Sequence, residues 1–600
     1  MGDIYFVKYV DKSTIWCYNV IDVDLSTIIA RTEIFMKNYA LLPSIEYKTM
    51  RELIEVSCKR YANRTAFSYR SHPRSKNSEK ISFETLCEDV RALGTEFICR
   101  GYQKKHIAVI GKMSYSWIIS YLSLIASGAV IVPLDAEWSA EELAATADFA
   151  DCEYMICDAS LSEKSDIIMD ISEKIKERIV IGTSDVDDNL EKLKNRGKDR
   201  IISGDNSYFN MKHETNDVCE IVFTSGTTGK GKGVKLSQKA LLSDIANGLK
   251  YITVSKKTIA VLPLHHTFGS TINILGHICV GSEVYLSMGV RYVLKELKTE
   301  KPEHLVLVPL YLETFYRKIL ANAKENGKDK ALFAMMKLSG ALRKIGIDKR
   351  RLFFKSVLDA FGGELKMVIS GGAPLSAEIS DSFEAWGIDV INGYGITECS
   401  PLISVNRNKA RIKGSVGFVL PCDEVKIAEP NDDGEGEIRV KGPNVMLGYY
   451  KNEEATADVF DEEGYFKTGD FGKLDENGAL YITGRLKNLI ILSNGKNVYP
   501  EEIESVLAPV PGVLDVVVYE GQSKRGIEHN AIVAEVFPDE EYMKSNVITD
   551  VKKYLQKFVD DYNRTAVPYK KIGLLKIRTE DFPKNTLRKI QRFKIDRTID

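Results

Sequence analysis

The sequence predicts an α/β fold, with a large N-terminal domain of two mostly parallel sheets covered by helices, a small antiparallel β subdomain, and a small α+β C-terminal domain. Three observations lead to this prediction. Short apolar runs alternate with helical patterns from about residue 47 onward, which is typical of parallel sheets buried on both faces. From about residue 415, short alternating segments are separated by Asn, Asp and Gly turns, which indicates antiparallel strands. About a hundred residues then follow Gly484–Lys487, enough for a separate small domain.

The elements can be placed in chain order. Ser237 is expected to cap a helix that runs to about Leu249. Between Pro309 and Leu365 lies a helical stretch rich in Lys and Arg, and we interpret it as a solvated helical hairpin. Short apolar runs predict buried strands at residues 106–110, 129–132, 154–156, 220–223, 258–262, 305–308, 367–369 and 389–391. Alternating runs predict antiparallel strands at 436–440 and 478–482.

The longest uncharged run extends from Met113 to Leu134 and is long enough for a membrane span. Serines dilute its apolar character, and Gly128 and Pro133 interrupt it. A helix over 114–126 followed by a buried strand explains the run better. We therefore expect no transmembrane segment, whereas peripheral contact with a membrane stays open.

Composition and charge exclude several classes of protein. The chain has 600 residues, 44% of them hydrophobic and 28% charged, as in ordinary globular proteins. Its 82 basic and 84 acidic residues nearly cancel, so charge gives no argument for a nucleic-acid partner. Ten cysteines are scattered without a CxxC pair, which argues against zinc and fits a reducing compartment. Charges at Asp3, Lys8, Asp11 and Lys12 interrupt any signal-peptide core, so we expect a cytoplasmic protein.

The strongest local motif is a glycine- and hydroxyl-rich loop, Thr224-Ser225-Gly226-Thr227-Thr228-Gly229, directly after a predicted strand. Glycines allow close approach of the backbone to a ligand, and backbone amides in such loops bind anions. Lys232 adds positive charge. A flexible linker is the alternative, but the dense hydroxyls argue against it. The loop also nearly matches a Walker A motif, except that Gly233 stands where a magnesium-binding Ser or Thr is needed, which weakens a P-loop phosphotransferase interpretation.

This loop resembles the signature loop of the adenylate-forming (AMP-binding) superfamily, which includes acyl-CoA synthetases, firefly luciferase and the adenylation domains of peptide synthetases. Gly231 stands where the family usually has proline. Further family motifs follow in order, beginning with Pro263–Gly269, in which His266 matches the histidine that borders the acyl carboxylate. The resemblance assigns ATP binding to Thr224, Ser225, Gly226, Thr227, Thr228, Gly229, Lys232, Gly371, Gly372, Ala373, Pro374, Asn392, Gly393, Tyr394, Gly395, Thr397, Asp470 and Arg485.

Individual roles come from the same resemblance. Tyr394 would stack on adenine, and Asn392 would contact its edge. Thr397 would bind phosphate, and Glu398 would bind Mg²⁺ with help from Thr224, because Mg²⁺ prefers few carboxylates plus phosphate oxygens. The ribose hydroxyls would be held by Asp470 and Arg485. The catalytic residues would be Lys589, His266, Thr397 and Glu398.

The C-terminal motifs imply a mobile domain. Lys487 matches the hinge, and Gly495 matches the path of coenzyme A. Lys589 falls in register with the catalytic lysine of the family, although Leu587-Arg588 replaces the usual Ser-Gly before it. The implied domains are an N-terminal extension (1–46), an AMP-binding domain (47–484, with the β subdomain at about 415–484) and a mobile C-terminal domain (485–600).

The implied function is an ATP-dependent acyl-CoA ligase, with ATP, Mg²⁺ and coenzyme A as cofactors or co-substrates. The segment between Pro309 and Ser370 resembles the long-chain fatty acid branch, which implies a medium- to long-chain fatty acid. Alternatives are loading of an acyl carrier protein, ligation of another carboxylic acid, a P-loop phosphotransferase that would release ADP, and a catalytically silent binding protein. The sequence leaves the oligomeric state open.

Overall fold

The computed structural model describes residues 40–182, 189–224, 231–492, 497–522, 531–584 and 589–599. The chain divides into two compact units, Met1–Ala40 and Leu41–Asp600, and the description below concerns the second. Predicted site residues Ser225, Gly226, Thr227, Thr228, Gly229 and Gly495 lie outside the described residues.

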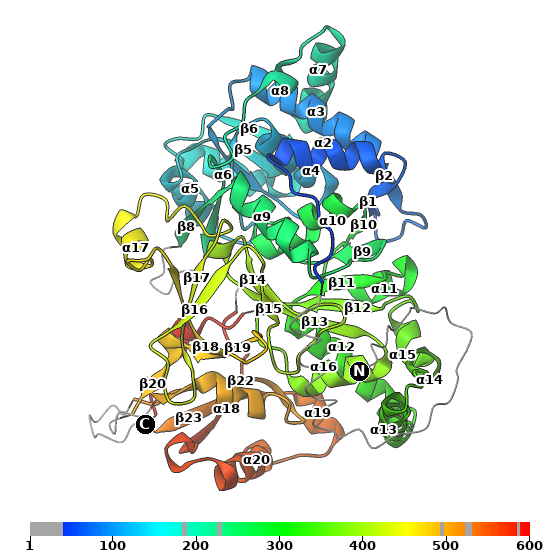
Figure 1. Cartoon of the computed structure of the whole chain (residues 1–600), viewed down its shortest axis with the longest axis vertical. Coiled ribbons are helices and arrows are strands. Elements are labelled where there is room, and N and C mark those ends of the chain that lie inside the picture. Colours follow the sequence, from blue (N-terminus) through cyan, green and yellow to red (C-terminus); the bar gives the residue numbers. More distant parts are fainter. Residues whose placement is uncertain are drawn as a thin grey trace, which may run out of the picture. The chain divides into compact units, whose positions relative to one another are not determined.

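A six-stranded sheet forms the first layer, in the order β6-β5-β3-β4-β7-β8. Its strands β5, β6 and β8 are labelled in Figure 1. Its strands are β3 (His106–Ile110), β4 (Val130–Leu134), β5 (Cys152–Asp158), β6 (Glu177–Ile181), β7 (Val218–Thr224) and β8 (Lys232–Ser237). All neighbours are parallel except β7 and β8. Every residue of β4 is buried, as expected for a parallel strand covered on both faces.

The helix before β4 is α4 (Tyr115–Ala126), and the side chain of its N-cap, Ser114, accepts a hydrogen bond from the backbone N–H of Trp117. The uncharged run from Met113 to Leu134 is thus a buried helix followed by a strand. No helix in the part of the chain that the structure describes is both long enough and apolar enough to cross a membrane.

The second predicted parallel sheet is built from two hydrogen-bonded ladders. The first has the order β2-β1-β10-β9 and the second the order β11-β12-β13-β14-β15. They adjoin where the backbone N–H of Glu303 donates to the carbonyl oxygen of Lys257 at 3.0 Å. The strands are β1 (Thr65–Tyr69), β2 (Glu79–Ser82), β9 (Lys257–Ala260), β10 (Glu283–Leu286), β11 (His304–Leu307), β12 (Met367–Ser370), β13 (Asp389–Gly395), β14 (Leu402–Val405) and β15 (Phe418–Val419).

Strand β13 is longer than predicted, because it continues through the Asn392–Gly395 motif. Glycine makes this continuation possible. A Cβ atom at Gly395 would lie 1.8 Å from the carbonyl oxygen of Pro401, so only glycine lets the two backbones approach this closely.

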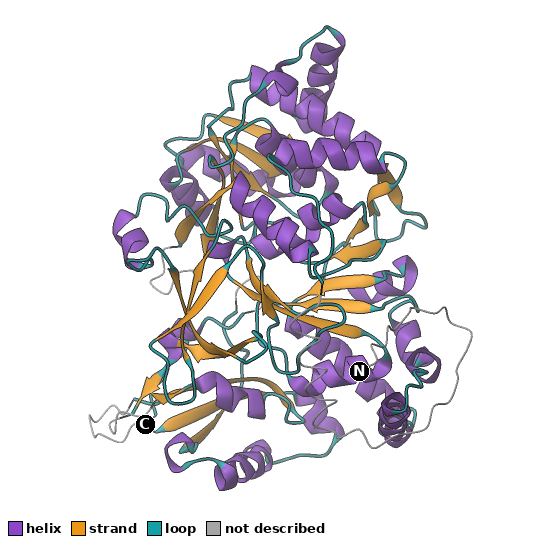
Figure 2. Ribbon diagram, viewed as in Figure 1, coloured by secondary structure: helices purple, strands orange, loops and turns teal. Residues whose placement is uncertain are grey.

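Helices cover these sheets (Figure 2), as predicted for an α/β fold. Ser237 caps α9 (Gln238–Leu249), where the sequence placed this helix. A π-helix, η2 (Phe268–Leu275), leads into α10 (Gly276–Val280) and was not expected from the sequence. The other helices of this part are α2 (Met50–Tyr61), α3 (Phe83–Cys99), α5 (Ala140–Phe149), α6 (Ser162–Ile171), α7 (Leu190–Ile202), α8 (Ser207–Asn210), α11 (Val293–Glu300), α12 (Pro309–Glu325), α13 (Asp329–Lys344), α14 (Arg350–Phe353), α15 (Lys355–Ala360), α16 (Ala377–Trp386) and α17 (Glu453–Asp458).

An antiparallel sheet follows, as the change of pattern after residue 415 predicted. It has the order β16-β17-β18-β19, with strands β16 (Glu424–Ala428), β17 (Gly436–Lys441), β18 (Phe466–Leu474) and β19 (Leu480–Arg485). The turn η4 (Leu486–Asn488) connects β19 to the C-terminal part.

The C-terminal part has its own small core around a three-stranded sheet, β22-β23-β24. Leu555 and Val559 of α20 belong to this core, together with Val518 and Val536 of the sheet. The elements are β20 (Ile490–Ile491), β21 (Asn497–Val498), α18 (Pro500–Leu507), β22 (Val513–Glu520), β23 (Ile532–Pro538), α19 (Glu540–Ser545), α20 (Val551–Thr565) and β24 (Leu574–Ile577).

Candidate active site

One large cleft, with a volume of about 2690 Å³, gathers the predicted site residues. It is lined by strand ends and loops of both parallel layers, by β18 and β19, and by the C-terminal segment. The predicted residues on its wall are Thr224, Lys232, His266, Gly371, Gly372, Ala373, Pro374, Asn392, Gly393, Tyr394, Gly395, Thr397, Glu398, Asp470, Arg485, Lys487 and Lys589. Motifs up to 365 residues apart in the sequence therefore meet in one place.

Asp470 joins two of these motifs. Its Oδ2 accepts a hydrogen bond from the Tyr394 hydroxyl at 2.7 Å, and its Oδ1 accepts from Nε of Arg485 at 2.8 Å. Burial, followed by the charge of Asp470, raises the pKa of Tyr394 well above its ordinary value, so the hydroxyl stays a donor. A carboxylate has lone pairs left for further donors, such as two ribose hydroxyls.

Asn392 presents an unused acceptor on the same wall. Its side-chain Oδ1 is buried and has no hydrogen-bond partner among the residues that the structure describes. Because a buried acceptor without a partner is destabilising, a ligand donor at this point would satisfy it. The exocyclic amine of adenine is a donor of this kind.

Glu398 is positioned by a residue to which the sequence analysis assigned no role. The hydroxyl of Tyr449 donates to Oε1 of Glu398 at 2.9 Å, and Nζ of Lys232 lies 4.6 Å from the centroid of the Tyr449 ring. The two residues that make this contact, Tyr449 and Glu398, are 51 positions apart in the sequence. Tyr449 thus places the candidate metal ligand beside the lysine that follows the phosphate loop.

The oxygens near Glu398 fit Mg²⁺. Both Glu398 and Thr224 line the cleft, and they offer a carboxylate and a hydroxyl. Among the described residues, no cluster of three or more His, Cys, Asp or Glu side chains could hold a metal by itself. The oxygens of Glu398 and Thr224 match the preference of Mg²⁺, which usually takes one or two carboxylates and completes its shell with water and substrate phosphates.

Lys589 reaches into the cleft opposite the glycine-rich wall. A Cβ atom added at Gly372, which has φ +85°, would lie 4.0 Å from Nζ of Lys589. The surrounding protein and the nearby charge of Arg485 lower the pKa of Lys589 to about 8. Burial and Arg485 also lower the pKa of Lys487. Three cations on one wall favour a polyanionic ligand such as a triphosphate.

His266 is neutral at physiological pH. Burial, then the neighbouring His265 and Lys589, lowers its pKa well below the ordinary value. The two histidine rings lie 4.3 Å apart, and His265 Nε2 is 3.5 Å from Oδ2 of Asp135. A neutral imidazole at the cleft wall can donate a hydrogen bond from its N–H to a carboxylate without forming an ion pair.

Part of the cleft lining comes from α9, the turn after it and the η2–α10 segment, and we call this part of the lining the arm. Its walls carry Ile245, Gly248, Leu249, Ile252, Ile272 and Gly276. Two titratable groups also line it, and both favour the neutral form. Burial raises the pKa of Asp244 well above its usual range and lowers the pKa of His277 to about 4. The arm is therefore largely apolar, as an alkyl chain requires.

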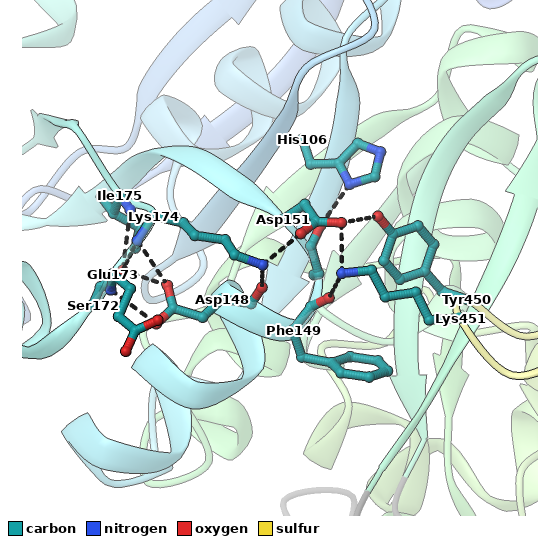
Figure 3. Close-up of polar contacts among 11 residues, drawn as sticks. His106, Asp148, Phe149, Asp151, Ser172, Glu173, Lys174, Ile175, Tyr450 and Lys451 are labelled. Atoms are coloured by element: carbon teal, nitrogen blue, oxygen red, sulfur yellow. Dashed lines mark hydrogen bonds and ion pairs between the residues drawn. The ribbon is translucent and has the colours of Figure 1, made fainter.

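A short segment, 447–451, holds parts of the site together. The backbone N–H of Tyr450 donates to the carbonyl oxygen of Gly233 at 2.7 Å, so the segment runs beside β8. Figure 3 shows how the segment is anchored at Asp151, which accepts from the Tyr450 hydroxyl at 2.5 Å and pairs with Lys451 at 2.7 Å and Lys174 at 2.6 Å. Although burial raises the pKa of Asp151, these donors outweigh it and lower that pKa well below its ordinary value.

Fold and cleft together define a nucleotide-dependent enzyme of several α/β layers with its site between the larger part and the C-terminal part. A profile of the family described as "AMP-binding enzyme" matches residues 54–450, and the chain belongs to this family. It is therefore a ligase-type enzyme that uses ATP.

Individual relatives are similar over most of the chain. The rat protein named long-chain-fatty-acid–CoA ligase 5 is 29% identical over 552 residues, covering 86% of this chain and 79% of that protein. An Arabidopsis thaliana protein named long-chain-fatty-acid–[acyl-carrier-protein] ligase AEE15, chloroplastic, is 28% identical, with coverage of 86% and 81%. The structure of the anthranilate CoA ligase AuaEII in complex with anthranoyl-AMP superposes with a TM-score of 0.72 at 20% identity, covering 92% of this chain and 97% of that one. A Mycobacterium tuberculosis fatty acyl CoA synthetase superposes with a TM-score of 0.61 at 22% identity, with coverage of 90% and 96%. At these identities the structural likenesses establish the fold.

Proposed function

We propose that the protein is an ATP-dependent acyl-CoA ligase that activates a medium- to long-chain fatty acid as an acyl-adenylate and then forms the acyl-CoA thioester. The observation that carries this proposal is the lining of the cleft. It combines a polar wall with Asn392, Asp470 and Lys589 and the largely apolar arm formed by α9 and the η2–α10 segment. The names of the rat and Arabidopsis relatives, both long-chain fatty acid ligases, support the same substrate class.

In the first half-reaction, the carboxylate of the acid attacks the α-phosphorus of ATP, and pyrophosphate leaves. No general base is needed, because a carboxylic acid is already ionised at neutral pH. Negative charge accumulates on the phosphate oxygens, where Lys589 and the hydroxyl of Thr397 would stabilise it. Tyr394, Asp470 and Arg485 would hold the nucleoside, and Glu398 with Thr224 would hold Mg²⁺. The metal would supply charge neutralisation on the phosphates.

In the second half-reaction, the thiol of coenzyme A attacks the acyl carbon and AMP leaves. We propose that the C-terminal domain turns about Lys487, which withdraws Lys589 and opens a path for the thiol past Gly495. Gly495 and the phosphate loop 225–229 lie outside the described residues, so their roles stay predictions from the motifs.

The length of the apolar arm can be tested at Gly276. A Cβ atom there would lie 3.7 Å from its nearest neighbour, the carbonyl oxygen of Thr271, so the fold tolerates a side chain. Gly276→Leu should shorten the arm and lower kcat/KM for long-chain acids by about 100-fold, because a steric change of several carbons in an apolar pocket has effects of this size. Activity with short acids should stay within about twofold of the original enzyme.

Gly276→Ala is the control with a smaller side chain. It should change the dependence of kcat/KM on acyl chain length less than Gly276→Leu does. The measurement is kcat/KM for a series of acids of increasing length. An equal loss for all lengths would show that Gly276 does not border the acyl chain.

The low pKa of Lys589 predicts a pH dependence. Lys589 has to be protonated to stabilise the phosphates, and its pKa in the free enzyme is about 8. The value of kcat/KM for ATP in adenylate formation should therefore be constant below pH 8 and fall by about tenfold per pH unit above it. Lys589→Arg should remove this decrease, since guanidinium stays charged, even if its rate is lower. A profile for the original enzyme that stays flat up to pH 10 would contradict the assignment.

The whole proposal is tested by measuring AMP release over carboxylic acids of graded chain length, with coenzyme A present. Release of AMP with fatty acids is the expected result. Release of ADP would indicate a phosphotransferase, and no turnover with any acid would refute a ligase. The Arabidopsis relative makes acyl carrier protein the second candidate acceptor, so the screen is repeated with holo-acyl carrier protein in place of coenzyme A.

A further inference from the structure

Helix α13 has two unlike faces. Leu332, Met335 and Met336 point inward and pack against the core formed by α12, α15, α16 and their strands. The opposite face carries Lys330, Phe333, Lys337, Leu338, Ala341 and Lys344, all of them exposed. At 100° per residue these positions fall on one side of the helix. The outward face of α13 therefore combines lysine side chains with large apolar side chains.

The exposed apolar side chains continue beyond the helix. Leu338 is 51% exposed, Ile345 at the end of α13 is 70% exposed, and Leu352 in the neighbouring α14 is 69% exposed. Helices α13 and α14 lie side by side (Figure 1). We call the outward face of α13, the following turn and α14 (residues 330–352) the α13–α14 surface. Large apolar side chains gathered on one surface indicate a binding partner.

The same surface is strongly basic although the chain as a whole is nearly neutral. Between residues 330 and 352 the one acidic residue is Asp348, against seven lysines and arginines. Asp348 is paired with Arg350 at 2.7 Å, so it neutralises a charge outside the outward face of α13. That face therefore carries three lysines and no carboxylate.

We propose that the α13–α14 surface docks on the headgroup region of an anionic lipid bilayer. Apolar groups alternating with lysines on an exposed helix are typical of helices that lie in a membrane interface. Lysine side chains can extend to the lipid phosphates while their methylene chains and the neighbouring Leu and Ile enter the acyl boundary. An acidic protein partner could also bind the lysines. The exposed apolar side chains, however, lie on a helix face and do not line a groove, which favours a lipid bilayer over a protein.

The position of the surface relative to the cleft adds a reason. Asp329 and Phe333 of α13 line the cleft, as do Leu320, Ala321 and Lys324 of α12. The cleft therefore extends to the helix that carries the surface. If the proposed fatty acid ligase activity is correct, docking would bring the cleft next to the membrane in which such acids dissolve. Membrane binding itself does not depend on that activity.

The test is flotation of the full chain with vesicles of phosphatidylcholine alone or with phosphatidylglycerol added, without ATP or acid. The protein should float with the anionic vesicles and lose this binding as salt is raised. Lys330→Gln, Lys337→Gln and Lys344→Gln together should weaken binding by about 100-fold, since each lysine near an anionic surface contributes about fivefold. Leu338→Ser, Ile345→Ser and Leu352→Ser together should weaken it by at least about tenfold.

Matched controls separate this surface from general charge and hydrophobicity. Lys552→Gln, Lys553→Gln and Lys557→Gln remove the same charge from exposed positions of α20. Ile202→Ser with Val290→Ser removes apolar side chains that are 82% and 64% exposed elsewhere. Both controls should float like the original protein. All variants should keep the original melting temperature within about 2 °C, because surface substitutions rarely change stability much.

Several results would overturn the proposal. Equal flotation with neutral and anionic vesicles, or equal losses in the controls, would show that the surface is not specific. Failure to float, combined with binding of acidic acyl carrier protein that the three Lys→Gln changes abolish, would assign the surface to a protein partner. Membrane binding without AMP release from any acid would support the surface and refute the proposed function, so the two failures are distinguishable.

Discussion

Lys589→Ala is expected to slow adenylate formation by about 100-fold to 1,000-fold, the usual effect of removing one group that stabilises transition-state charge. Lys589 lies on the cleft wall, with Nζ next to Gly372 and the other cations of the site. Transfer of the acyl group to coenzyme A from a preformed acyl-adenylate should proceed at nearly the original rate, because we propose that Lys589 has left the site by then. Single-turnover measurements of the two half-reactions give both rates.

Lys594→Ala is the matched control for this prediction. Lys594 is an exposed lysine five positions further along the same segment and does not line the cleft. It should leave both half-reactions unchanged. A defect in Lys594→Ala and none in Lys589→Ala would mean that the wrong lysine was assigned, and equal loss of both half-reactions in Lys589→Ala would refute its separate role.

Lys487→Pro is expected to have the opposite effect. Lys487 lies in the single turn η4, between β19 of the larger part and β20 of the C-terminal part. Proline fixes its own φ angle and restricts the residue before it, Leu486, so the turn loses rotational freedom. Thiol transfer should slow on the order of 100-fold, because a small misplacement of reacting groups has effects of this size. Adenylate formation should change by less than about threefold.

The variant Lys487→Ala distinguishes stiffness from charge. It removes the ammonium group but leaves the turn free to rotate, so thiol transfer should be largely preserved. If Lys487→Ala slows thiol transfer as much as Lys487→Pro does, the charge matters and the hinge assignment is wrong. A normal second half-reaction in Lys487→Pro would contradict the proposed rotation directly.

Much of the fold could be predicted because its signals are local. The helix capped by Ser237 was predicted from its capping residue. The buried strand β4 was predicted at 129–132 from a short apolar run, and the structure has it at Val130–Leu134. The extension of β13 through Gly395 could not be predicted, because glycine is also what a turn requires. Only the close approach of Pro401, seen in three dimensions, shows why that glycine belongs to a strand. The π-helix η2 likewise has no sequence pattern of its own.

The site shows the same division. The motifs identified residues such as Asp470 and Glu398. The structure places the predicted site residues that it describes on the wall of one cleft. The partners that position these residues were not predictable from one sequence. Tyr449 contacts Glu398, which is 51 positions away in the sequence, and Tyr450 contacts Asp151, which is 299 positions away. Such contacts depend on how the layers pack, which periodicity and composition do not encode.

The contacts of segment 447–451 have a consequence for how the protein folds during its synthesis. Strand β8, which follows the phosphate loop, pairs with a segment that is synthesised more than 200 residues later. That segment also forms a hydrogen bond with Asp151, directly before β5. Contacts between such distant parts of a chain form late and slowly, since a long loop has to close first. A nascent chain that has emerged only as far as β14 therefore has Asn392, Tyr394 and Glu398 but neither the support for Glu398 and β8 nor the later residues Asp470 and Arg485. We expect ATP affinity to arise late in synthesis, after residues 447–451 have joined the sheet and Asp470 and Arg485 have followed.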